Sequence, residues 1–471
     1  MTEEILNSAA GKPDTAATRA PMISIDATGL LSWGGDQAVA GIQRVESFII
    51  KAALAETDPR VGVVAVNLSN HRFRPLFPYE QAQLAANDIA PSRIERGTAM
   101  MAALPRALQL VRQYPIAKRE ADRQLARMVT NGRTGFGFKS AALLLRAYRL
   151  YRRAWVRLGA SRQMPTPEPT ELEQSTVLIS HQMLAGDNRS SVSGEINRIA
   201  FLCHDLIPVV RPDLVDQGKL EKAFGANVES LVRSGATAFC ASETASGMLI
   251  DHMRLAGINP PVVHRFPMPS ILHETAVRLG MTSRIETSEP FVLYCSTINV
   301  RKNHILLARI WQQALDEGVT LPKLVCAGRW GGMMDPLRAY LDAHPELAKS
   351  LTFTGPINDE ELIRYYRSAS FGVFPSHIEG WGYAASECLD FGIPVIVSTT
   401  PALIEASRGL MPTIDSEDQA GWYAAIRKMA DDTAWRSSLV DRIAQHHRPT
   451  PAAASWAAIK AGLQASASRQ R

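Results

Sequence analysis

The sequence has few of the features that place a chain in a membrane or outside the cell. No apolar run in its 471 residues approaches the ~18 residues that a membrane-spanning helix needs. It has only five cysteines, none of them in a C-x-x-C pair, so we expect neither disulfides nor a zinc site. Residues 1–20 begin with acidic side chains and lack the apolar core of a signal peptide. They are predicted to be a disordered leader of a cytoplasmic protein.

The composition is that of a large globular protein. Hydrophobic residues make up 46% of the chain and charged residues 21%, which is ordinary for such proteins. A chain of this length exceeds what one hydrophobic core usually organises, so two domains of roughly 200 residues are expected.

Short apolar, β-branched segments alternate with helical patterns along two stretches, 22–267 and 291–446. This alternation predicts parallel sheets built from right-handed βαβ units. The predicted fold class is therefore α/β, with two doubly wound Rossmann-like domains facing across a cleft. Ligands of such folds bind at the carboxyl ends of the strands.

The domain boundaries follow from the weakly patterned stretch 275–290, which is the predicted linker. The N-terminal domain then covers 21–280 and the C-terminal domain 281–450. A C-terminal helix or tail is predicted over 451–471.

A strongly basic block lies inside the N-terminal half. Residues 101–162 hold 14 Lys and Arg against two acids, so their net charge is +12 and that of the remaining chain is −7. Within them, aromatic and aliphatic residues from Leu144 to Leu158 form one helical stripe flanked by arginines. Two interpretations stay open: a helix on an anionic membrane surface, or a helical insertion over about 96–165 that packs its stripe on the N-terminal domain. No nucleic-acid-binding module accompanies the charge, so no nucleic-acid partner is predicted.

The segment 371–398 carries the most chemical information. A buried strand ends at Pro375-Ser376, a loop holds Glu379-Gly380-Trp381-Gly382, and a helix then carries Glu387. Glycines let a backbone approach a ligand closely, and the free N–H groups at a helix start bind anions. The arrangement suits a ligand with phosphates in its middle and hydroxyls at both ends, which is the shape of a nucleotide sugar.

This segment resembles the E-x7-E element of the family 4 (group 1) glycosyltransferases, which are retaining enzymes of the GT-B type. The resemblance covers most of 291–430 and, more thinly, 22–56 and 196–245. The stretches that carry it are VRKN (300–303), LVCAGRWG (324–331), FTGPINDEEL (353–362), FPSHIEGWGYAASECL (374–389), GIPVIVS (392–398), AGIQRV (40–45) and HDLIP (204–208).

The resemblance implies a role for each matching residue. Lys302, with Arg301, would hold the diphosphate and stabilise its charge as it leaves. Glu379 would bind hydroxyls of the donor sugar, Glu387 those of the ribose, and His204 would lie against the sugar. The remaining implied positions are the amides of Gly380 and Gly382 for phosphate or sugar, Gly41 for room beside the β-phosphate, and Pro356 and Ile357 beside the base.

One position departs from the family pattern. Many members have an Arg after a Gly near the end of the first strand of the C-terminal domain, where this chain has Cys295-Ser296. One phosphate-binding cation is therefore missing there or supplied from elsewhere, with Arg329 as a candidate.

The implied activity is retaining transfer of a hexose, with mannose favoured, from GDP or UDP to a saccharide or lipid-linked acceptor in glycan or polysaccharide biosynthesis. The departing phosphate would itself take the acceptor proton, so the protein would supply positioning and charge stabilisation. The chain contains no D-x-D motif, and we expect neither a metal nor another cofactor.

Three other functions compete with transfer. A nucleotide-sugar epimerase or a sugar phosphorylase would share the GT-B fold, and a non-catalytic scaffold of a polysaccharide complex would keep the core without the cleft residues. The third is a nicotinamide-dependent oxidoreductase, because Gly380-x-Gly382-x-x-Ala385 resembles a dinucleotide fingerprint. The next strand, however, ends in Ser398-Thr399-Thr400 rather than in the acid that a nicotinamide cofactor needs.

Overall fold

The computed structural model describes residues 23–32, 41–67, 72–76, 78–85, 175–180, 198–215 and 219–469. The leader predicted over 1–20 and the basic insertion predicted over about 96–165 lie outside these residues, and so does the whole block 101–162.

The described N-terminal half is built on a seven-stranded sheet in the order β3-β2-β1-β4-β5-β6-β7. All neighbouring strands are parallel except β2 and β3, which pair antiparallel. The strands are β1 Ile23–Asp26, β2 Val61–Asn67, β3 Arg72–Pro75, β4 Thr176–Ile179, β5 Arg198–Leu202, β6 Thr237–Cys240 and β7 Val263–Arg265.

The helices of this half pack against the sheet through apolar side chains. Helix α2, for example, buries Val45, Ile49 and Ile50 in the same core as Ile23 of β1. The helices are α1 Thr28–Ser32, α2 Gly41–Leu54, α3 Pro78–Ala85, α7 Ile207–Val210, α8 Lys219–Arg233, α9 Glu243–Leu255 and α10 Ile271–Arg278, with a 3-10 turn at Pro212–Leu214.

The C-terminal half has a six-stranded sheet, β10-β9-β8-β11-β12-β13, in which all neighbouring strands are parallel. Its central strands are fully buried and rich in apolar residues, as expected for a parallel sheet covered on both faces. The strands are β8 Phe291–Cys295, β9 Lys323–Ala327, β10 Leu351–Gly355, β11 Phe371–Phe374, β12 Val395–Ser398 and β13 Thr413–Ile414.

The helices of the C-terminal half share one large core with these strands. They are α11 His304–Asp316, α12 Asp335–Ala343, α13 Asp359–Ser368, α14 Tyr383–Asp390, α15 Pro401–Ala406, α16 Gln419–Asp431 and α17 Thr433–His446, with 3-10 turns at Val300–Lys302 and Pro345–Lys349.

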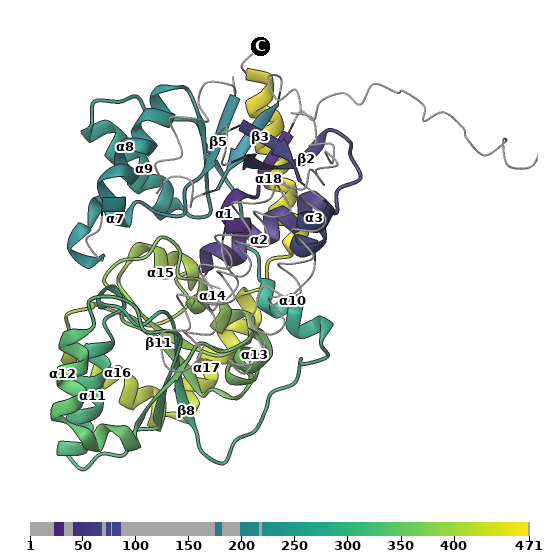
Figure 1. The fold of residues 1–471 in the computed structure, drawn as a ribbon. Helices are drawn as coiled ribbons and strands as arrows, with labels where there is room; N and C mark the ends of the chain where they lie inside the picture. The colour runs from purple at the N-terminus through teal and green to yellow at the C-terminus, as the bar shows by residue number, and fades with distance from the viewer. Residues whose placement is uncertain are drawn as a thin grey trace, which may run out of the picture.

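The two halves form two lobes that face each other, with α14 and α15 of one lobe beneath α1, α2 and α9 of the other (Figure 1). In each sheet the strand order reverses beside the first strand, between β1 and β4 and between β8 and β11. Such switch points open crevices for ligands at the carboxyl ends of the strands. The α/β prediction of two doubly wound domains in a GT-B arrangement is confirmed.

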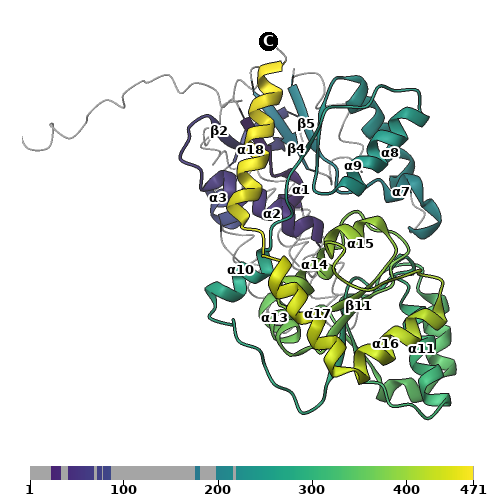
Figure 2. The same ribbon diagram turned by 180° about the vertical axis from the view of Figure 1, so that it is seen from behind.

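The last helix returns to the first lobe. Helix α18, Ala452–Arg469, leaves the C-terminal half and lies along the N-terminal sheet (Figure 2). Its Ile459 and Leu463 are buried in the same core as Ile23 and Leu178. Gly462 allows this approach, because a Cβ there would lie 2.7 Å from the ring of Phe239.

The linker and one helix differ from the prediction. The sequence predicts a linker over 275–290, but α10 continues to Arg278, so the irregular part is shorter. A helix predicted over about 335–347 ends at Ala343 and is followed by a 3-10 turn, because Pro345 cannot continue the helix. Within the described residues, no helix is long and apolar enough to span a bilayer.

The docking of α18 predicts how substitutions on its two faces affect stability. Ile459→Ala removes a fully buried side chain and should lower the free energy of unfolding by about 2–5 kcal/mol. Gln464→Ala, on the exposed face of the same helix, should change it by less than about 0.5 kcal/mol. Urea denaturation measures both. Equal effects of the two substitutions would contradict the docked position of α18.

Candidate donor-binding site

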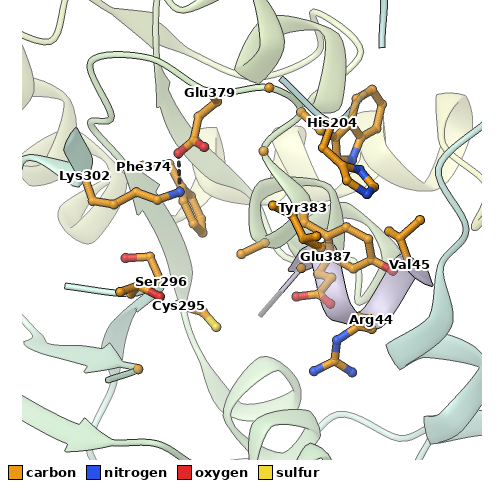
Figure 3. Close-up of a pocket in the computed structure, with 18 of the residues that line it drawn as sticks. Arg44, Val45, His204, Cys295, Ser296, Lys302, Phe374, Glu379, Tyr383 and Glu387 are labelled. Atoms are coloured by element: carbon orange, nitrogen blue, oxygen red, sulfur yellow. Dashed lines mark hydrogen bonds and ion pairs between the residues drawn. The ribbon is translucent and has the colours of Figure 1, made fainter. Parts of the chain in front are cut away.

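One cavity of about 390 Å³ lies between the two halves and is lined by residues of both. Its walls hold every residue that the sequence predicted for the site: Gly41, His204, Arg301, Lys302, Pro356, Ile357, Glu379, Gly380, Gly382 and Glu387. Cys295, Ser296 and Arg329 line it as well. Figure 3 shows the acidic and basic side chains of this cavity projecting from both halves.

The glycine turn before α14 shapes one wall of the cavity. Gly382 has φ of 99°, a left-handed conformation that glycine adopts at little cost. It is the N-cap of α14 and has no side chain to cap the helix, although its carbonyl accepts a hydrogen bond from the Ala385 N–H at 3.0 Å. Tyr383 and Ala384, the first two residues of α14, line the cavity, so this helix end faces a ligand bound there.

Gly380 presses this turn against the N-terminal half. A Cβ at Gly380 would lie 2.7 Å from the Cβ of Asp205 and even closer to the carbonyl oxygen of His204. The hydroxyl of Ser242, at the start of α9, donates a hydrogen bond to the Gly380 carbonyl at 2.5 Å. A larger residue at position 380 would push the two halves apart, so glycine is required here by packing between the halves.

Glu379 lies between two cations. Arg301 donates to one carboxylate oxygen at 2.6 Å, and the Lys302 ammonium pairs with the other. Burial by itself would raise the pKa of Glu379, but the charges of Arg301 and Lys302 outweigh burial and hold it at about 2. Glu379 is therefore ionised at every physiological pH, and the three groups together carry a net positive charge.

The residues around Lys302 hold it in place through its backbone. Val300–Lys302 forms a 3-10 turn whose N-cap, Asn299, accepts a hydrogen bond from the Lys302 N–H at 3.2 Å. The Tyr294 hydroxyl donates to the Lys302 carbonyl at 2.6 Å. Asn303 then takes a left-handed conformation, with φ of 55°, and starts α11. The short turn thus aims two adjacent basic side chains into the cavity.

Glu387 lies in a different environment from Glu379. Its side chain is buried, and one of its oxygens accepts a 2.8 Å hydrogen bond from the Tyr366 hydroxyl. Burial raises the pKa of Glu387 to about 7, against the opposing charge of Arg44. The two glutamates of the E-x7-E element therefore differ, because one is permanently charged and the other titrates near neutral pH.

The sequence reasoning missed two charged residues of this cavity, Arg44 and Asp359. Arg44 of α2 makes a two-point ion pair with Asp359 of α13, at 2.8 and 2.9 Å, and so joins the two halves. Both residues lie in stretches that resemble the family, AGIQRV and FTGPINDEEL. Arg44 is three residues after Gly41, on the same face of α2. That spacing could have indicated that Arg44 faces the cavity together with Gly41, but the sequence analysis assigned a role to Gly41 alone.

Two of the predicted positions have surroundings that the sequence did not indicate. A Cβ at Gly41 would meet the Tyr383 side chain at an ordinary 3.7 Å, so packing in the protein does not itself require glycine there.

The second position is Cys295-Ser296, where the family pattern has Gly-Arg. The Ser296 hydroxyl lies 3.3 Å from the His304 ring nitrogen. Burial lowers the pKa of His304 to about 3, so His304 is neutral and adds no positive charge.

Known proteins with similar sequences are glycosyltransferases. The family model of glycosyl transferases group 1 matches residues 289–432. The chain is 24% identical over 219 residues to the serotype-specific mannosyltransferase WbdA of Escherichia coli, an alignment that covers 44% of this chain and 27% of WbdA.

Two solved structures resemble the whole described fold. The sucrose-phosphate synthase of Thermosynechococcus elongatus has a TM-score of 0.51 and 17% identity, covering 95% of this chain and 98% of that one. Anabaena Alr3699/HepE in complex with UDP and glucose has a TM-score of 0.53 and 12% identity, covering 94% and 99%. At these identities the similarity concerns the fold alone.

The raised pKa of Glu387 predicts a pH-dependent effect on stability. Between pH 4.5 and about 7 the unfolded chain loses the Glu387 proton while the folded chain keeps it, so stability falls as pH rises. Glu387→Gln removes this dependence and can still accept from Tyr366. The melting temperature of the ligand-free variant should therefore exceed that of the wild type at pH 8, with a smaller gap at pH 5. A gap that does not change with pH would contradict the buried, titrating carboxyl.

Proposed function

We propose, because residues 289–432 match the glycosyl transferases group 1 family, that the protein is a retaining GT-B glycosyltransferase. It moves a hexose from a nucleotide-diphosphate donor to a saccharide or a lipid-linked acceptor in glycan or polysaccharide biosynthesis. The observation that carries this proposal is the cavity that gathers all ten predicted catalytic and donor-binding residues from both halves.

The distribution of charge in the cavity supports a nucleotide-sugar donor. Arg301, Lys302 and Glu379 together carry a net charge of about +1, whereas Arg44, Asp359 and ionised Glu387 carry about −1. A diphosphate is attracted to the first group, which lies beside the uncapped start of α14. Hydroxyl donors of a ribose suit the second group, because an ionised carboxylate only accepts hydrogen bonds.

The same residues suit the leaving-group chemistry of a retaining transfer. As the bond between sugar and phosphate breaks, Arg301, Lys302 and the α14 N-terminus stabilise the charge that grows on the phosphate. The departing phosphate oxygen takes the proton of the acceptor hydroxyl, which then attacks from the same face of the sugar. Glu379 accepts hydrogen bonds from the sugar hydroxyls, and His204, whose backbone carbonyl adjoins Gly380, contacts the sugar from the N-terminal half.

Three finer proposals rest on more limited observations. We propose GDP or UDP as the nucleotide, with mannose favoured as the sugar, which the similarity to a mannosyltransferase supports. The WbdA alignment covers only about a quarter of WbdA, so the acceptor is proposed only as a chemical class.

The third proposal concerns location. The +12 charge of residues 101–162 supports a cytoplasmic protein bound peripherally to an anionic membrane.

A thermal-shift screen of GDP-, UDP-, dTDP- and ADP-sugars tests the donor. One of the first two should raise the melting temperature of the wild type, because a ligand that binds only the folded state stabilises it. Lys302→Ala should abolish that shift and lower the rate of transfer by about 10²-fold or more. Lys323→Ala is the matched control, since Lys323 forms an exposed ion pair with Glu289 and does not line the cavity. Normal turnover by Lys302→Ala would refute the role of Lys302.

Positive charge from side chains also predicts metal independence. Arg301 and Lys302 supply the charge that a divalent cation provides in other transferases. The transfer rate should therefore be the same with and without an excess of EDTA. Loss of activity in EDTA that is restored by Mg²⁺ or Mn²⁺ would show that the diphosphate needs a metal here.

A further inference from the structure

Arg44 holds a position that the proposed donor chemistry does not explain. It lies in the first turn of α2, its side chain is only 11% exposed, and it lines the cavity. Both terminal nitrogens of its guanidinium are bound by the two carboxylate oxygens of Asp359. This two-point geometry fixes the plane of the guanidinium. Arg44 is therefore not free to turn toward a phosphate at the other end of the cavity.

The group beside Arg44 inside the cavity is Glu387 (Figure 3). One oxygen of Glu387 is bound by Tyr366, and the other is buried and has no hydrogen-bond partner among the described residues. Glu387 lines the cavity, so its carboxyl group is placed to accept from a ligand there. A carboxylate offers two acceptors to a pair of hydroxyls, whereas a protonated carboxyl loses part of that capacity.

The charges around Glu387 show how much depends on Arg44. Burial disfavours the ionised form, and Asp390 of α14 and Asp359 of α13 act in the same direction. Arg44 of α2 and the Tyr366 hydroxyl of α13 favour ionisation. The other titratable groups coupled to Glu387 are neutral at physiological pH: Tyr383, Cys295 and Cys388. Among the described residues, Arg44 is thus the main cation that opposes the burial of Glu387.

We propose that Arg44 is a positioning residue that holds a positive charge beside Glu387, whose carboxylate receives the ribose hydroxyls of the nucleotide. The inference rests on the proposed function, because it assigns the ligand of Glu387 to the nucleoside part of a donor. The proposal also gives the cations of the cavity different roles. Arg301 and Lys302 serve the diphosphate, and Arg44 serves the nucleoside end through a neighbouring acid.

This assignment makes the nucleoside end depend on how the halves are placed. Arg44 comes from the N-terminal half, and Glu387, Tyr366 and Asp359 come from the C-terminal half. The cation beside Glu387 is therefore supplied by the opposite half.

The test compares Arg44→Gln with Asp359→Asn. We expect Arg44→Gln to raise the pKa of Glu387, so that binding of GDP or UDP weakens about tenfold near pH 7 and recovers toward pH 9. Arg44→Lys, which keeps the charge, should restore part of the affinity. Asp359→Asn removes a negative charge near Glu387 and should move the pH dependence in the opposite direction. Isothermal titration calorimetry from pH 5.5 to 9 measures all four proteins.

Two controls distinguish an effect on Glu387 ionisation from a purely structural role of Arg44. The loss in Arg44→Gln should be smaller for 2′,3′-dideoxynucleotides, which lack the hydroxyls assigned to Glu387. If the loss in Arg44→Gln persists unchanged at pH 9, Arg44 acts only as a structural bridge and the proposal is wrong.

The ligand-free proteins give a readout that does not depend on the proposed function. The fall in melting temperature caused by Glu387 ionisation should move to higher pH in Arg44→Gln and to lower pH in Asp359→Asn. Failure of the wild type to bind any nucleotide would overturn the proposed function and the nucleoside assignment. An unchanged unfolding profile in both variants would overturn the coupling of Arg44 to Glu387.

Discussion

The rest of the site depends on a buried carboxylate that two cations share. Glu379 is removed from water and would be costly there without Arg301 and Lys302. The pairing ties the loop before α14 to the turn before α11, although Lys302 and Glu379 are 77 positions apart along the chain. Because Gly380 follows Glu379 directly, fixing the carboxylate also fixes the point where the two halves touch. The ion pairs of Glu379 and the close contact at Gly380 between the halves therefore involve adjacent residues.

A second feature of the cavity is that several of its charged side chains form ion pairs with each other. These pairs form two separate clusters. The cluster of Arg301, Lys302 and Glu379 comes from the C-terminal half alone. The cluster around Arg44 and Asp359 spans both halves. One end of the cavity is thus formed within a single lobe, and the other end exists only when both lobes are in place.

The sequence predicted the fold class because strands and helices have local patterns, and the resemblance to a known family supplied the residues that line the cavity. Strands such as 395–398 are fully buried and apolar, and the E-x7-E segment is continuous along the chain. Contacts across the interface could not be predicted in the same way. Nothing in the spacing of residue 44 and residue 359 indicates that they pair, and the opposite protonation behaviour of Glu379 and Glu387 depends on neighbours from other elements. The return of α18 was also beyond local reasoning, because its Ala- and Ser-rich sequence has only a weak apolar stripe.

The route of α18 bears on the order in which the chain is built. The strands of the C-terminal sheet lie in one continuous stretch, from Phe291 to Ile414. The N-terminal sheet, although synthesised first, is covered on one side by residues 452–469. During translation the part of its apolar surface that α18 covers therefore stays open until this helix emerges from the ribosome, while α2 already covers another part. Domains usually fold in the order in which they are synthesised. Here the N-terminal lobe is synthesised first, but its packing is completed last, when α18 binds to it.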